Sequence, residues 1–193
     1  MRAGWTGLAL LAAACVFRNA DDPRFFRPES AALDTAQGAA LERPGPGTPL
    51  RLRPVRATPL LRERIVWRVS SVEYGLYEQR RWSELPASFV ERALGNALAA
   101  TPGIALTQAI GVATLRVEVL GFDEVQAPAH VAAVSLAVSL EDRDHRPLLD
   151  RTFRAEEPIA GEAPAAMATA MGKALDSVVA EVARAVGDAL PAP

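Results

Sequence analysis

The segment that begins at Pro164 carries the pattern that most restricts how this chain can fold. Apolar side chains recur there every three or four residues, while charged side chains such as Asp176 and Glu181 fall elsewhere on the helical wheel. The apolar positions are Met167, Met171, Leu175, Val178, Val182 and Val186. This spacing predicts an amphipathic helix, and its apolar face must be buried against a second layer of structure.

Predicted strands supply that second layer. Residues 113–125 and 131–140 alternate apolar and polar side chains, which is typical of half-buried strands. Residues 148–156 return as a strand after a polar turn, so the last two strands are expected to form a hairpin. Three further strands, rich in β-branched and aromatic residues, are predicted at 50–57, 64–70 and 72–77.

A second helix is predicted between the two groups of strands. Ser83 is its expected N-cap, an apolar face runs from Phe89 to Leu98, and Thr101-Pro102-Gly103 ends it. This order of elements predicts an α+β domain over residues 50–188, in which two helices pack on one face of a mainly antiparallel sheet. Residues 189–193 are predicted to form a C-terminal tail.

The first fourteen residues, MRAGWTGLALLAAA, are typical of a bacterial secretory signal peptide. Arg2 supplies the positive charge, and an apolar run leads to Cys15, the only cysteine of the chain. The stretch Leu10-Leu11-Ala12-Ala13-Ala14-Cys15 resembles a lipobox, although Ala12 stands where leucine is commonest. We therefore expect cleavage before Cys15 and its lipidation, with a plain secretory signal as the alternative.

Residues 15–49 are predicted to form a flexible, lipid-anchored tether. Five prolines and three glycines interrupt residues 16–49, and no helical or strand period is sustained. The Phe25-Phe26 pair is the exception, because two adjacent exposed rings are unusual in a spacer, and we expect it to dock on the domain. Val16 follows the cysteine, and by the sorting rule of bacterial lipoproteins this indicates the outer membrane.

The composition argues against several classes of function. The formal net charge is −2 and the pI is about 5.8, which argues against a nucleic-acid partner. No apolar run reaches the roughly 18 residues that a transmembrane helix needs. One cysteine and two histidines cannot make a disulfide framework or a Cys/His zinc cluster within one chain, so no metal or cofactor is predicted.

Few residues are candidates for catalysis. His130 lies at a predicted strand start and His145 in a predicted exposed turn, and neither is expected to be catalytic. The acidic turn that contains Asp142 and Asp144 lacks the glycine and terminal glutamate of a calcium loop, so we expect a solvated turn. The sequence therefore predicts a protein that is not an enzyme.

An aromatic and arginine-rich segment between Arg64 and Phe89 has two interpretations. It can form an aromatic sub-core that fixes the first long helix to the sheet, with the arginines stacking outside. It can instead form a partner-binding surface, since Trp, Tyr and Arg are enriched at interface hot spots. The residues that would bind the partner are Tyr77, Arg80, Arg81 and Trp82.

Residues 55–98, VRATPLLRERIVWRVSSVEYGLYEQRRWSELPASFVERALGNAL, resemble the ABC-type transport auxiliary lipoproteins, the PqiC family. The resemblance rests on an ordered series: a strand pair containing VR and RIVWR, then a helix start containing RW, P and FV. It extends to residues 113–122, to residues 149–159 and to the C-terminal helix. Arg24-Phe25-Phe26 is similar to an aromatic N-terminal segment of some members.

The resemblance implies a non-enzymatic outer-membrane lipoprotein that faces the periplasm of a Gram-negative bacterium. Such a protein would be the auxiliary component of an Mce-type lipid transport system. It would dock the MCE-domain periplasmic protein, which works with an inner-membrane ABC permease and ATPase. A ring-forming homo-oligomer and direct contact with lipid stay open.

Two alternatives to this function remain. One is a cell-envelope structural lipoprotein that binds peptidoglycan or another periplasmic complex. The other is a periplasmic hydrolase that uses His145 or the acidic turn.

Overall fold

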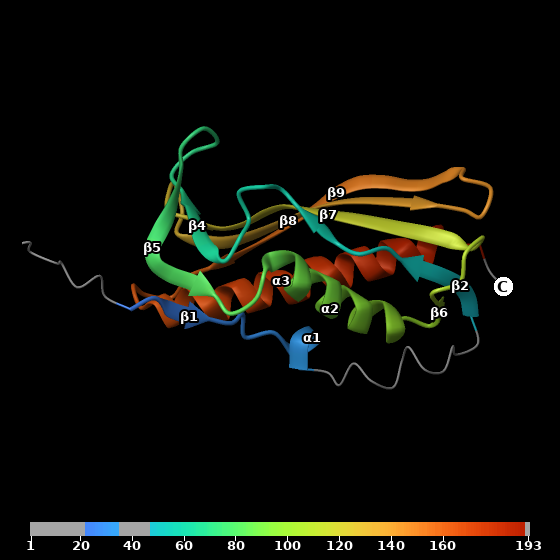
Figure 1. Cartoon of the computed structure of the whole chain (residues 1–193), viewed down its shortest axis with the longest axis horizontal. Helices are drawn as coiled ribbons and strands as arrows, with labels where there is room; N and C mark the ends of the chain where they lie inside the picture. Colours follow the sequence, from blue (N-terminus) through green and yellow to red (C-terminus); the bar gives the residue numbers. More distant parts are fainter. Residues whose placement is uncertain (1–21, 35–46, 192–193) are drawn as a thin grey trace, which may run out of the picture.

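The computed structural model describes residues 22–34 and 47–191, and it consists of one large sheet with helices on one face (Figure 1). The helices are α1 Ala31–Asp34, α2 Pro86–Ala99 and α3 Pro164–Ala189. The strands are β1 Arg24–Phe26, β2 Gly47–Leu52, β3 Arg56–Ala57, β4 Arg64–Arg68, β5 Tyr74–Trp82, β6 Gly103–Leu106, β7 Ala113–Val125, β8 Val131–Glu141 and β9 Pro147–Pro158.

Strand β7 is the centre of the sheet. Along one edge it pairs antiparallel with β8 over almost its whole length, and β8 pairs with β9 in the same way. Along its other edge β2, β3 and β4 follow one another, each parallel to a different part of β7. Strand β5 then pairs antiparallel with β4, β1 parallel with β5, and β6 parallel with β2. The long ladders confirm a mainly antiparallel α+β fold, whereas the parallel pairs were not predicted.

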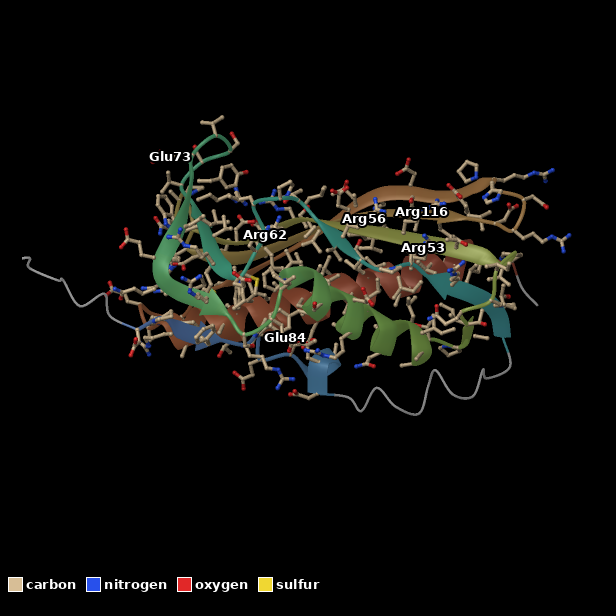
Figure 2. All side chains as sticks on the ribbon, viewed as in Figure 1. Arg53, Arg56, Arg62, Glu73, Glu84 and Arg116 are labelled. Carbon is tan, nitrogen blue, oxygen red and sulfur yellow. The ribbon has the colours of Figure 1, made fainter. Side chains whose placement is uncertain are left out.

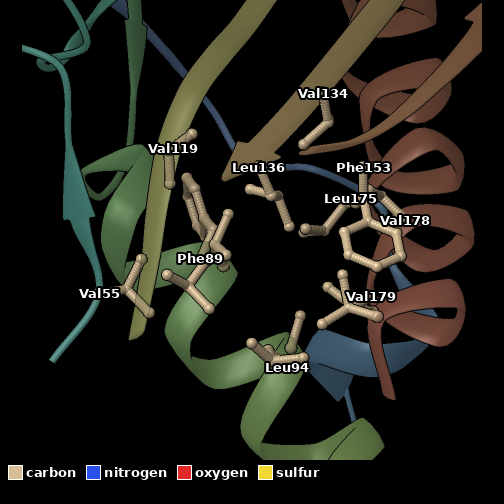
Figure 3. Close-up of a cluster of buried hydrophobic side chains, with 14 of the residues drawn as sticks. Val55, Phe89, Leu94, Val119, Val134, Leu136, Phe153, Leu175, Val178 and Val179 are labelled. Carbon is tan, nitrogen blue, oxygen red and sulfur yellow. The ribbon is translucent and has the colours of Figure 1, made fainter. Parts of the chain in front are cut away.

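The core lies between the sheet and the two long helices. The apolar stripe of α3 is buried as the sequence predicts, and Figure 3 shows Leu175 and Val178 beside Leu136 and Phe153 of the sheet. Helix α2 buries Phe89 and Leu94 against the same layer. The predicted start of α2 is wrong, because Leu85 is the N-cap and Pro86 opens the helix, where its missing amide hydrogen costs no hydrogen bond.

The folded domain begins earlier than residue 50. Residues 22–34, which we call the strap, lie within the predicted tether but pack across the helices. The buried hydroxyl of Ser30 donates to Asp176 Oδ1 of α3 at 2.5 Å, and the amides of Ala31 and Ala32 donate to the same carboxylate at 2.9 and 3.1 Å. Leu33 is buried. The predicted docking of the Phe pair holds for Phe26, which packs against the core.

The close approach of the strap to α3 gives a first prediction. A Cβ added at Gly172 would lie 1.8 Å from the carbonyl oxygen of Glu29, and that backbone contact can be relieved only if the strap moves. Gly172→Ala is therefore expected to lower the free energy of unfolding by about 1–3 kcal/mol and to speed tryptic cleavage after Arg24.

Gly95→Ala is the matched control, because a Cβ there would meet nothing within 4 Å and Gly95 also lies inside a helix. It is expected to raise the free energy of unfolding by roughly 0.5–1 kcal/mol. Equal effects of the two substitutions in urea unfolding would contradict the packed strap.

Candidate interaction surface

The hairpin of β4 and β5 stands away from the body of the domain (Figure 1). Val72, at its tip, is 88% exposed, and Tyr74 is half exposed. The Ser70 hydroxyl oxygen accepts the amide hydrogen of Val72 at 3.3 Å, and the Trp67 ring lies directly over Gly75, where a Cβ would be only 2.1 Å away. The hairpin therefore presents one exposed apolar side chain, Val72, among polar residues at the tip of an arm that is held by its own contacts.

Arg80 contacts both the Tyr77 ring and the buried carboxylate of Glu124 on β7. The Arg80 guanidinium lies 4.1 Å from the Tyr77 ring centroid, and its Nη1 is 3.9 Å from Glu124 Oε2. The Glu124 side chain is only 6% exposed, and its Oε1 lies 2.7 Å from His130 Nε2. Gln126 Nε2 donates to the Tyr77 hydroxyl at 3.1 Å. These contacts fix Tyr77 and Arg80 in position.

Electrostatics at this cluster follow from burial. Burial, followed by the negative charge of Glu124, raises the pKa of Tyr77, so its hydroxyl stays protonated well above neutral pH. Among the described residues, Glu124 Oε2 is the buried side-chain oxygen without a hydrogen-bond partner. Arg80 forms an ion pair with that oxygen, and the Arg80 side chain is partly exposed.

Trp82 belongs to the core, and its prediction as a partner-binding residue is wrong. It is 1% exposed and packs edge-on against Phe122 and Phe89, with ring centroids 5.2 and 6.2 Å away. For Trp82 the sub-core interpretation is thus confirmed, since the ring joins β5, β7 and α2. Arg81 precedes it on β5 and stays partly exposed, because neighbouring residues of a strand point to opposite faces.

A buried ion pair joins β4 to β7 near the hairpin. Arg68 Nε donates to Asp123 Oδ2, and both side chains are largely shielded from water. Burial raises the pKa of Asp123 above its ordinary value, while the charge of Arg68 acts in the opposite direction. The buried charge of each residue, Arg68 and Asp123, is therefore compensated only while the other residue is present.

A second surface, which the sequence analysis missed, lies on the face of the sheet away from the helices. It is a hollow of about 560 Å³ around Arg53, Arg56 and Arg116. These three arginines are labelled in Figure 2. Arg116 pairs with Glu141 at 2.7 Å, whereas within residues 22–34 and 47–191 neither Arg53 nor Arg56 has a carboxylate partner. The small outward residues of β8, such as Ser135, Ala137 and Ser139, are the sequence signal that indicates this hollow.

The acidic segment forms a hairpin turn, as predicted. Asp142 Oδ1 accepts the amide hydrogens of Asp144 and Arg146 at 2.8 and 2.9 Å, and His145 adopts a positive φ of 62° at the turn. In the part of the chain that the structure describes, no group of three or more His, Cys, Asp or Glu could hold a metal ion. In the same part, no helix has the length and apolarity to cross a bilayer.

The predicted lipidation site, Cys15, and the predicted signal peptide lie outside the described residues.

The fold is similar to that of several solved structures. A Xanthomonas campestris protein of the DUF330 family is 21% identical, with a TM-score of 0.70 over 86% of this chain and 96% of that one. An uncharacterized protein is 18% identical, with a TM-score of 0.65 over 86% and 99%. A hypothetical protein from Chlamydia trachomatis is 10% identical, with a TM-score of 0.53 over 74% and 96%. At these identities the likeness shows a shared fold.

The sequence also matches a family model described as "ABC-type transport auxiliary lipoprotein component" over residues 32–183. No curated protein matches the chain. The matched range runs from α1 into α3 and so includes the β4–β5 hairpin and all strands from β2 to β9, whereas β1 lies before it.

Proposed function

Because the chain belongs to the family of ABC-type transport auxiliary lipoprotein components, we propose that it is the auxiliary subunit of an Mce-type lipid transport system at the outer membrane. The observation that carries this proposal is the family match, which covers most of the folded domain. The subunit faces the periplasm and binds rather than catalyses.

Cys15 carries the lipid in this proposal. It is the only cysteine of the chain, it follows the apolar run of the signal peptide, and the family consists of lipoproteins. Three acyl chains on one cysteine exceed the two signals that stable membrane anchoring requires. Val16 after the cysteine favours the outer membrane.

Tyr77, Arg80 and Arg81 form the proposed partner surface, together with the exposed hairpin tip at Val72. Arg80 is held by Glu124 and Tyr77 is held by Arg80 and Gln126 before binding, so little side-chain freedom is lost when a partner docks. Aromatic and arginine side chains in such a setting are typical of interface hot spots. The partner that we propose is the MCE-domain protein, which works with an inner-membrane ABC permease and ATPase.

The test combines intact mass with crosslinking in cell membranes. A photo-reactive residue replaces exposed Glu73, and the membrane-extracted protein is compared with Cys15→Ser. We expect a mature mass that begins at Cys15 plus three acyl chains, and an MCE-domain protein in the crosslinked product. A crosslink to peptidoglycan or to another envelope complex would instead support a structural lipoprotein.

Arg80→Ala/Arg81→Ala is expected to lower the crosslink yield at least tenfold, since a hot spot contributes about 2 kcal/mol or more. Arg143→Ala/Arg146→Ala, in the exposed β8–β9 turn, is the matched control and should change nothing. The thermal midpoint of each variant is measured alongside. An unchanged yield in a folded Arg80/Arg81 variant would remove this surface from the proposal.

A further inference from the structure

The strap changes how far the domain can stand from its anchor. If all of residues 15–49 were free, the extended chain would reach about 110 Å. The strap pairs with β5 from Arg24 onward, and residues 35–46 connect α1 to β2, two parts of the same domain. Only nine residue steps therefore separate Cys15 from the first strand of the folded structure, and they span at most about 32 Å.

The chain enters the domain at one end of its long axis. Figure 1 shows β1 at the end that also carries the β4–β5 hairpin, while β2 and β6 lie at the opposite end. A short link to a lipid at Cys15 therefore holds the β1 end close to the membrane. The β2–β6 end, with exposed Ile110 in the loop after β6, lies farther from the anchor.

An exposed aromatic ring lies at this entry point. Phe25 is 62% exposed, although Phe26 beside it packs against the core. Its neighbour Arg24 is exposed as well, and in the parallel register Arg24 and Phe25 stand opposite Arg80 and Arg81 of β5. An apolar ring bordered by arginines suits the surface of an anionic bilayer, where rings lie at headgroup level and arginines attract anionic lipids.

The charges around the Phe25 ring favour the surface of an anionic bilayer as its partner. Arg27, the next arginine of the strap, is paired with Asp34 at 2.8 Å, and Asp22 is the exposed carboxylate closest in sequence to Phe25. Arg80 is likewise paired with Glu124, so Arg24 and Arg81 leave an excess of positive charge near Phe25.

We propose that Arg24 and Phe25, the β1 patch, rest on the surface of the membrane that holds the anchor. This inference rests on the proposed lipid at Cys15. The intrinsic affinity of one ring and its arginines for a bilayer is small, but the short link makes contact intramolecular at an effective concentration of millimolar or above. The anchor and the patch together then set the orientation of the domain.

The test uses the full lipidated chain in vesicles of phosphatidylethanolamine and phosphatidylglycerol. Because Cys15 is the only native cysteine and its thiol carries lipid, one introduced cysteine gives a unique label. One variant is labelled at exposed Gln79, two residues before Arg81 and so on the same face of β5, and another at Ile110. The readout is quenching of the fluorophore by a quencher on lipid headgroups.

We expect the label at Gln79 to be quenched at least threefold more than the label at Ile110. Arg24→Ser/Phe25→Ser is expected to lower the quenching at Gln79 and so to reduce that difference, while the short link still keeps Gln79 nearer the bilayer than Ile110. Ile110→Ser, which removes an exposed apolar side chain at the opposite end, is the matched control and should leave quenching at Gln79 unchanged. Circular dichroism checks that each variant is folded.

Two failures are distinguishable in this experiment. Protein that does not float with the vesicles and has the mass of an unmodified chain contradicts the lipid anchor, and with it the proposed function. Protein that floats but shows equal quenching at both positions, or quenching at Gln79 that Arg24→Ser/Phe25→Ser leaves unchanged, overturns the β1 patch and leaves the anchor intact.

Discussion

Trp82→Ala is expected to lower the free energy of unfolding by about 3–5 kcal/mol. The ring is fully buried between Phe89 of α2 and Phe122 of β7, so its removal leaves a cavity where two layers of the domain meet. Urea unfolding followed by circular dichroism measures the change. The loss includes the edge-on aromatic contacts as well as the buried apolar area.

Phe25→Ala is the matched control for this substitution. It also removes an aromatic ring, but from an exposed position, and we expect a change within about 0.5 kcal/mol. A loss below about 1 kcal/mol in Trp82→Ala, combined with loss of the crosslink to the partner, would contradict the core assignment and restore Trp82 to the interaction surface.

Arg68→Ala is expected to cost about 3–5 kcal/mol at neutral pH, because it leaves the buried carboxylate of Asp123 without its cation. Arg68→Met/Asp123→Asn removes both charges while keeping similar volumes, and it should recover most of the loss. Arg143→Ala serves as the control, since its pair with Asp144 is exposed and we expect a change near zero. A similar loss in the single and double variants would show that packing rather than charge is responsible.

The loss in Arg68→Ala is also expected to depend on pH. Burial already raises the pKa of Asp123 above 3.8, and removal of Arg68 raises it further. The folded variant then holds a proton at pH values where the unfolded chain has released it. Its stability is therefore greatest below the unfolded pKa and falls as pH rises through the folded pKa. The difference from wild type should shrink as pH is lowered from 7 toward 4, which urea titrations at several pH values measure.

The spacing of apolar residues along the chain predicted the individual helices and strands whose formation depends on neighbouring residues. The stripe from Met167 to Val186 became α3, and the alternation at 131–140 became β8 with its turn into β9. The parallel pairing of β2, β3 and β4 with β7 could not be predicted, because pairing between distant segments depends on the path of the chain and not on their own periodicity.

The strap and Trp82 show the same limit. Pro23 and Pro28, together with the prolines and glycines that follow up to residue 49, made residues 22–34 resemble a spacer. The carboxylate of Asp176 and the absence of a side chain at Gly172 give them a place on α3. Trp82 ends a strand whose preceding residues are half exposed, and only its packing against Phe122 shows which face it occupies. Of the candidate site, Tyr77, Arg80 and Arg81 remain predictions, as does lipidation of Cys15.

The strap also affects how the domain responds to a pulling force at its N-terminal end. If Cys15 carries a lipid as proposed, tension on that anchor would enter the domain at Arg24, and a pull along β1 would load its bonds to the parallel strand β5 across their length. In that shear geometry the bonds share the force and must break together, instead of opening one after another. Behind them, the three hydrogen bonds to Asp176 act as a second restraint in series. A transport partner that strains against the membrane would therefore displace the domain as a whole before it peels the strap away.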